Sequence, residues 1–231
     1  MPSLFSSPGG FLRSSIGRKW IVAVTGLILV GFVAGHLVGN LLVFAGPDAL
    51  NEYAVFLHQF LHGGAIWIAR LVLLASVGAH IYFTILLTRE NRAARQQRYA
   101  VEVTQNASSG SRWMIWSGLL VLAFIIFHLL HYTVRIGAGF RELPLDSEGR
   151  FDVYRMLILG FSNPLVSLFY AIAIAMLSWH LSHGVSSMFQ TLGITTPQTR
   201  QLFDRIAIAF SALLFVGYVS IPLSVLLGWI S

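Results

Sequence analysis

The apolar stretch RWMIWSGLLVLAFIIFHLLHYTVR, from Arg112 to Arg135, decides the fold. At about 1.5 Å of rise per residue, a helix of this length crosses the hydrocarbon core of a bilayer, which is about 30 Å thick. Between its terminal arginines the stretch has no Asp, Glu, Lys or Arg, but it contains His128 and His131. An ionisable side chain inside a membrane span is unfavourable and marks a functional site by default, so these histidines are interpreted as functional.

Four more apolar stretches accompany this one, and the composition agrees with a membrane protein. The 231 residues are 56% hydrophobic and 10% charged, whereas a soluble domain has about 25% charged residues. We predict an all-α integral membrane protein in which five transmembrane helices form one bundle. The predicted spans cover about residues 19–44, 64–88, 112–135, 164–189 and 203–230. We expect residues 1–231 to form a single transmembrane domain without an internal repeat.

Two shorter helices are expected outside the spans. One lies within residues 46–63, with Pro47 and Asp48 near its start, and the other lies around Val153–Leu159.

Basic residues are distributed unevenly between the loops, which predicts the orientation of the chain. Counted with the edges of the spans, three lie at the start of the first span, five lie around the loop between the second and third spans (Arg112 included), and two lie around the loop between the fourth and fifth, which makes ten on one side. The opposite side has four, namely Arg135, Arg141, Arg150 and Arg155. The positive-inside rule then places the N-terminus in the cytoplasm and the C-terminus outside.

Two of the histidines in the predicted spans share an outer depth. His36 lies sixteen residues after Trp20, and His128 lies sixteen residues after Arg112. Because both helices start at the cytoplasmic side, each histidine lies about 24 Å from that end of its helix.

Two others share an inner depth on helices that run in the opposite direction. His80 lies eight residues before Thr88, and His180 lies nine residues before Phe189. Each lies roughly 12–14 Å from the cytoplasmic end of its helix. The histidines therefore form an outer pair and an inner pair.

Two imidazoles at one depth on different helices can clamp a haem from both faces. We predict two b haems, the outer one held by His36 and His128 and the inner one by His80 and His180. Bis-histidine ligation fills both axial positions, so it suits electron transfer rather than oxygen binding. The chain has no cysteine, which excludes c-type haem, thiolate-ligated clusters and disulfides. The alternative for each histidine is a hydrogen bond to a neighbouring helix.

The remaining histidines receive other interpretations. His131 and His183 each follow a predicted ligand by three residues, so we expect them to contact that ligand or a haem propionate instead of the iron. His58 and His62 form the pattern HQFLH, which lacks the glutamate of H-E-x-x-H and argues against a zinc hydrolase.

Several stretches together carry a resemblance to a known family. They are SSIGRKWIVAVTGL, GHLVGNLLVF, LHGGAIWIARLVLL, AHIYFTILLTRENRAAR, FHLLHYT and WHLSHGVSSMFQTLGI. In these stretches, which cover most of the first four predicted helices, the chain resembles the cytochrome b subunit of succinate dehydrogenase and of some fumarate reductases, of the type with five helices and two haems.

The resemblance implies a non-catalytic membrane anchor in the bacterial inner membrane, bound on its cytoplasmic side to a flavoprotein (FAD) subunit and an iron–sulfur subunit. Electrons from succinate would pass through this subunit to a quinone, menaquinone in the two-haem class. The axial histidines of the family fall on His36, His80, His128 and His180, and they agree with the pairing by depth.

A quinone could bind at either end of the bundle. Near the iron–sulfur subunit, the cytoplasmic edge of the first helix offers Ser14, Ser15 and Arg18. Near the outer haem, Glu52 and His58 offer an alternative site. Ordinary interfacial polarity explains the same residues equally well.

Two other functions remain compatible with the pattern. Cytochrome b subunits of hydrogenases and formate dehydrogenases also carry histidines on four or five helices, although the stretch HGVSSMFQTLG favours the succinate dehydrogenase family. A transporter or a haem-free anchor is the alternative of a different class, but the predicted spans contain no acidic residue except Asp204 at an edge.

Overall fold

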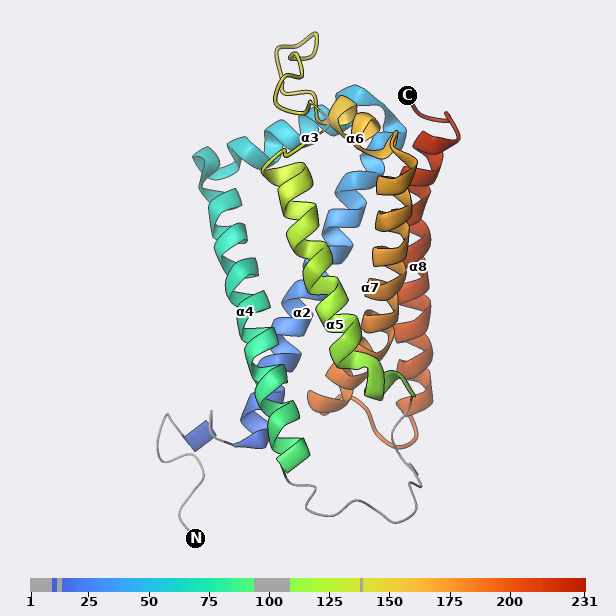
Figure 1. Cartoon of the computed structure of the whole chain (residues 1–231). Coiled ribbons are helices and arrows are strands. Elements are labelled where there is room, and N and C mark those ends of the chain that lie inside the picture. Colours follow the sequence, from blue (N-terminus) through green and yellow to red (C-terminus); the bar gives the residue numbers. More distant parts are fainter. Residues whose placement is uncertain (1–9, 12–13, 94–108, 138) are drawn as a thin grey trace.

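The computed structural model describes residues 10–11, 14–93, 109–137 and 139–231, and it is a bundle of long helices (Figure 1). Five segments in these ranges are long and apolar enough to cross a membrane. The predicted class, an all-α integral membrane protein with five spans, is confirmed. Arg13, Arg95 and Arg98, which contribute to the predicted charge asymmetry, lie outside the described residues.

The helices follow the predicted spans closely. The long ones are α2 (Ser15–Asn40), α4 (Gly64–Ala93), α5 (Ser109–His128), α7 (Pro164–Thr191) and α8 (Arg200–Leu226). The shorter ones, α3 (Pro47–Gln59) and α6 (Val153–Phe161), lie at the two predicted places. Three single-turn elements complete the order, namely η1 (Leu41–Ala45), η2 (Phe60–Gly63) and η3 (Leu129–Thr133).

Two helices end earlier than expected at residues with left-handed backbone conformation. The fifth span was expected to reach residue 230, but α8 ends at Leu226 and Gly228 follows with a φ of 68°. A glycine in this conformation terminates a helix, since it has no Cβ to clash. The third span was expected to continue regularly to Arg135, but η3 is a π-helical turn and Arg135 itself has a φ of 62°.

Side-chain caps set the start of several helices. Ser14 accepts a hydrogen bond from the backbone N–H of Gly17 at the start of α2, at 3.0 Å. Asn163 accepts one from Leu165 at the start of α7, at 3.0 Å, and Pro164 occupies the first turn. These partners satisfy N–H groups that have no acceptor within their own helix.

Four helices surround the space in which the predicted histidines lie. α4 packs on α2, α5 packs on α7, and α2 packs on α7, while α8 lies outside this group along α7 (Figure 1). α2 and α5 run in one direction and α4 and α7 in the other (Figure 1). Many apolar side chains on the outer faces are exposed, as in Trp67 and Leu74 of α4. A bundle that faces lipid is expected to carry such a surface.

Candidate functional site

The outer pair of histidines meets in the structure. His36 lies in α2, and His128 is the last residue of α5. Their ring centroids are 5.9 Å apart, and the ring planes cross at 81°. An imidazole nitrogen binds a metal ion at about 2 Å, so two imidazoles on opposite sides of one ion have ring centroids roughly 6 Å apart. The observed separation fits a bis-histidine metal site.

His128 is held through one of its ring nitrogens. Its Nδ1 lies 3.3 Å from the hydroxyl of Tyr170, a residue of α7 that is 3% exposed. Among the residues that the structure describes, Nε2 of His128 has no hydrogen-bond partner. A metal ligand commonly bonds its second ring nitrogen in this way, which fixes the ring and leaves the first nitrogen for the metal.

His80 of the inner pair is held in the same way by α2. Its Nδ1 lies 3.2 Å from the hydroxyl of Thr25 and 3.2 Å from the carbonyl oxygen of Val22. A Cβ on Gly26 would come within 3.4 Å of the His80 ring, so the glycine permits the close approach of the imidazole to α2.

His180 repeats this arrangement on the other pair of helices. Its Nδ1 lies 3.1 Å from the hydroxyl of Ser117, which is 1% exposed. A Cβ on Gly118 would come within 3.5 Å of the His180 ring. His80 of α4 and His180 of α7 thus each face a hydroxyl group and a glycine of a neighbouring helix, which is α2 for His80 and α5 for His180.

The two helix pairs therefore share a pattern that the sequence analysis missed when it predicted no internal repeat. In α2, Thr25 and Gly26 are followed after nine residues by His36. In α5, Ser117 and Gly118 are followed after nine residues by His128. This hydroxyl–glycine–x9–histidine pattern is the signal that could have been found from the sequence.

Open space and an unpartnered polar atom accompany the histidines. No atom of another segment lies within 4 Å of the place where a Cβ on Gly31 or Gly35 would stand, five residues and one residue before His36, and both glycines are exposed. One turn from His80, the hydroxyl of Thr84 is buried and has no hydrogen-bond partner among the described residues. These features fit a planar group with a polar edge between the helices.

His131 and His183 lie near the predicted ligands. The Nδ1 of His131 lies 3.1 Å from the hydroxyl of Tyr170, and the residue is 8% exposed within the π-helical turn η3. His183 contacts Trp179 edge to face, with ring centroids 5.8 Å apart. π-Helical turns are frequent at functional sites, and this one is in contact with a predicted ligand through Tyr170.

The cytoplasmic quinone candidates lie in or beside the first turn of α2. Ser14 is engaged as the helix cap and also donates a hydrogen bond to the carbonyl oxygen of Phe11, at 2.8 Å. Ser15 is exposed. Arg18 forms an ion pair with Glu90 at the end of α4, so its guanidinium joins the start of α2 to the end of α4.

The outer candidates Glu52 and His58 are not brought together. They are six residues apart on α3, so they lie on different faces of the helix. Glu52 reaches towards Arg150, 3.7 Å away, while Nδ1 of His58 lies 2.8 Å from the carbonyl oxygen of Ala54. A shallow hollow of about 400 Å³ at this end of the molecule is lined by neither of them; its lining is Phe56, Gln59, Phe60, Leu61 and His62.

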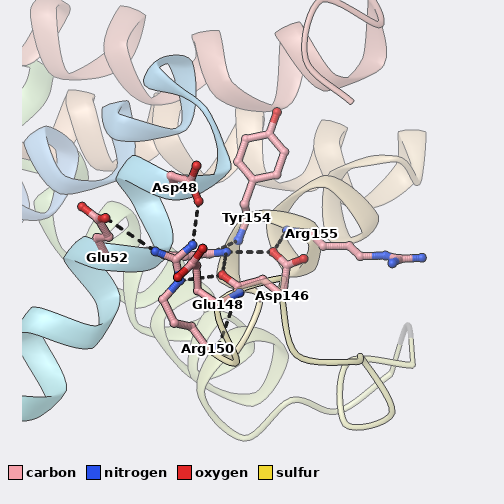
Figure 2. Close-up of polar contacts among 9 residues, drawn as sticks. Asp48, Glu52, Asp146, Glu148, Arg150, Tyr154 and Arg155 are labelled. Carbon is pink, nitrogen blue, oxygen red and sulfur yellow. Dashed lines mark hydrogen bonds and ion pairs between the residues drawn. The ribbon is translucent and has the colours of Figure 1, made fainter.

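Arg150 instead forms an ion-pair cluster at the outer end. Figure 2 shows its guanidinium between Asp48 and Glu52 of α3 and Asp146 of the loop before α6, with distances of 2.6 Å to Asp48 and 2.7 Å to Asp146. Burial by itself would raise the pKa of Asp146, but hydrogen bonds from Arg150, Asn51 and the Glu148 N–H hold it at about 2. The cluster therefore fixes the loop against α3.

Asn51 is a structural residue of this cluster that the sequence analysis missed. It is fully buried, and its amide donates to Asp146 at 3.0 Å and to Asp152 at 3.2 Å. Its side-chain oxygen accepts from the backbone N–H of Tyr154 at 3.0 Å. One side chain of α3 thus holds both the loop and the start of α6, and no local sequence pattern identifies it.

Comparison with known proteins gives one similar curated protein. The chain is 28% identical to the succinate dehydrogenase cytochrome b558 subunit of Bacillus subtilis (strain 168) over 202 residues. The aligned region covers 84% of this chain and 90% of that protein. No protein-family model matches the chain, and no solved structure matches it significantly. Together with the five spans, this similarity confirms that the chain is a multi-pass membrane protein that resembles the cytochrome b subunits of succinate dehydrogenase.

Proposed function

We propose that this protein is the membrane anchor and electron-transfer subunit of a succinate:quinone oxidoreductase. The observation that carries the proposal is the meeting of His36 and His128 from two different helices, with their ring centroids 5.9 Å apart. Three of the four predicted ligands have Nδ1 engaged with a hydroxyl group. This arrangement supports bis-histidine sites because it leaves Nε2 directed away from the hydrogen-bond partner.

His36 and His128 would hold the outer b haem, and His80 and His180 the inner one. Haem bound there would supply reversible one-electron transfer. The chain itself supplies the four ligands, the helices that set their depths and an apolar surround that excludes water. His131 and His183 would adjust the sites without binding iron.

The partners and the orientation are part of the proposal. A flavoprotein subunit and an iron–sulfur subunit would dock on the cytoplasmic side, where ten of the basic residues are predicted. The N-terminus would lie in the cytoplasm of a bacterial cell and the C-terminus outside the inner membrane, with residues 1–231 acting as one domain.

The position of the quinone can be tested through the outer haem. A cytoplasmic site would involve Ser14, Ser15 and Arg18, whereas an outer site would involve Glu52 and His58. In a His128→Ala variant that lacks the outer haem, full succinate–menaquinone activity would assign the working site to the cytoplasmic edge. Loss of that activity while the inner haem is still reduced by succinate would assign it to the outer end.

The function is tested on the complex purified with this chain. We expect two b haems per chain by haemochrome assay, co-purification of a flavoprotein and an iron–sulfur protein, and reduction of the haems by succinate. A complex without haem would exclude the electron-transfer role. Co-purification with a hydrogenase or formate dehydrogenase catalytic subunit would assign the chain to another quinone-linked enzyme.

A further inference from the structure

Three of the four paired histidines have the same kind of partner on a neighbouring helix. Each has Nδ1 within hydrogen-bond distance of a buried hydroxyl: His80 faces Thr25, His180 faces Ser117, and His128 faces Tyr170. A buried imidazole with two different nitrogens can adopt two neutral tautomers, and its partner decides between them.

In the inner pair, the hydrogen bonds determine which tautomer is present. The hydroxyl of Thr25 has the carbonyl oxygen of Ile21 as an acceptor, at 2.7 Å, and in that arrangement its oxygen accepts from His80. The carbonyl oxygen of Val22, which also faces Nδ1 of His80, has no proton to give. His80 must therefore carry its proton on Nδ1, which leaves the lone pair of Nε2 free.

The same reasoning applies to His180. When the hydroxyl of Ser117 donates to the carbonyl oxygen of Met114, at 3.0 Å, its oxygen accepts from Nδ1 of the imidazole, at 3.1 Å. His180 then donates from Nδ1 and presents an unprotonated Nε2. In this arrangement both inner imidazoles present Nε2 to a metal ion.

In the outer pair, one hydroxyl serves two imidazoles. The oxygen of Tyr170 lies 3.3 Å from Nδ1 of His128 and 3.1 Å from Nδ1 of His131. Since a hydroxyl has a single proton, it donates to one ring and accepts from the other. If His128 presents Nε2 to a metal, its Nδ1–H donates to Tyr170, and Tyr170 donates to His131.

His36 differs from the other three. Within the part of the chain that the structure describes, neither of its ring nitrogens has a hydrogen-bond partner, and its ring stacks on Phe32 with centroids 5.3 Å apart. The inner site therefore has two oriented ligands, and the outer site has only one.

We propose that Thr25, Ser117 and Tyr170 are positioning residues, which hold His80, His180 and His128 as the Nδ1-protonated tautomer and tune the haem that each ligand would bind. This inference rests on the proposed function. An acceptor at Nδ1 makes the imidazole a stronger electron donor and stabilises the oxidised metal. Removal of the acceptor should raise the midpoint potential of that haem and leave the other haem unchanged.

Thr25 offers a matched pair of variants. Thr25→Val keeps the shape and removes the hydroxyl, and Thr25→Ser keeps the hydroxyl. In the purified complex, potentiometric titration should show an upward shift of the inner-haem potential for Thr25→Val, in which the carbonyl oxygen of Val22 is the remaining acceptor at Nδ1 of His80. Thr25→Ser should have a potential close to the original. The electron paramagnetic resonance signal of the oxidised inner haem should change in the first variant alone. Selective loss of the inner haem from Thr25→Val would lead to the same conclusion, whereas identical behaviour of the two variants would overturn it.

Tyr170→Phe provides the converse test on the outer haem. The midpoint potential of the outer haem should rise and its electron paramagnetic resonance signal should change. The potential and the signal of the inner haem should stay as they are in the original protein. The role of Tyr170 would be refuted if Tyr170→Phe shifted the midpoint potential of the inner haem, or if it shifted the potential of neither haem. The proposed electron-transfer role itself fails if the unmodified complex contains no haem. If that complex contains two haems and these variants leave both spectra unchanged, the positioning inference alone is wrong.

Discussion

The imidazole rings of His36 in α2 and His128 in α5 meet with their centroids 5.9 Å apart and their planes at 81°. The two residues are 92 positions apart in the sequence, and their helices are brought together by α7, on which both pack. A metal site formed by these rings would therefore depend on the packing of three helices.

Replacement of His128 and of His131 in turn should show which of the two histidines binds the outer haem. We expect His128→Ala to lose the outer haem and His131→Ala to retain two low-spin haems, because only His128 faces His36 in the proposed site. Pyridine haemochrome assay and optical spectra of the purified complex provide the measurement. Retention of the outer haem in His128→Ala together with its loss in His131→Ala would show that the ligand is the other member of the pair.

The inner site should respond independently. We expect His80→Ala to lose the inner haem while the outer haem keeps both of its imidazoles, since the two pairs have no ligand in common. His36→Ala is the matched variant and should affect the outer haem only. Loss of the inner haem in His36→Ala, read from its midpoint potential, would contradict the pairing by depth.

The orientation can be tested with single cysteines because the chain has none of its own. Gln198 lies in the exposed loop between α7 and α8, and Ser147 lies in the exposed loop before α6. In intact spheroplasts, a membrane-impermeant thiol reagent should label Ser147→Cys and spare Gln198→Cys until the membrane is permeabilised. The opposite labelling would invert the predicted topology and move the docking face to the other side.

The ion-pair cluster at the outer end should weaken in acid. The pKa of Asp146 is lowered to about 2 in the folded protein, from an ordinary value of 3.8. Because the folded state lowers this pKa, the contribution of Asp146 to stability is complete above about pH 4 and disappears as the pH falls towards 2. Thermal unfolding in detergent should therefore show a larger difference between the original protein and Asp146→Asn at pH 7 than at pH 3. A difference that is equal at both values would refute the stabilising role of the carboxylate.

Asn51 should be sensitive to truncation. Asn51→Ala removes three hydrogen bonds of a fully buried side chain and should lower the free energy of unfolding by about 1–3 kcal/mol. Ser147→Ala, an exposed change in the same loop, is the control and should have little effect. Unfolding by SDS in mixed micelles measures both, and equal stability of the two variants would mean that Asn51 is not what holds the loop to α3.

The sequence by itself determined the class, the five spans and the depth of each histidine. Inside a bilayer no water is available to the backbone, so each span must satisfy its own peptide groups as a helix. That requirement is local, and a run of apolar residues such as 112–135 therefore reveals the helix and its length. The depth of each histidine follows because each span is a regular helix with a constant rise per residue. This rise places His36 level with His128.

Only the tertiary structure decided which side chains touch. Thr25 and His80 are 55 residues apart, Ser117 and His180 are 63 apart, and the partners of Asn51 are about 100 residues away. Contacts of this kind depend on the rotation of each helix about its axis and on the helix against which it packs, and hydropathy contains neither quantity. The tautomers of the histidines could not be predicted from the sequence either, because a neighbouring helix supplies the hydrogen-bond acceptor for each ring.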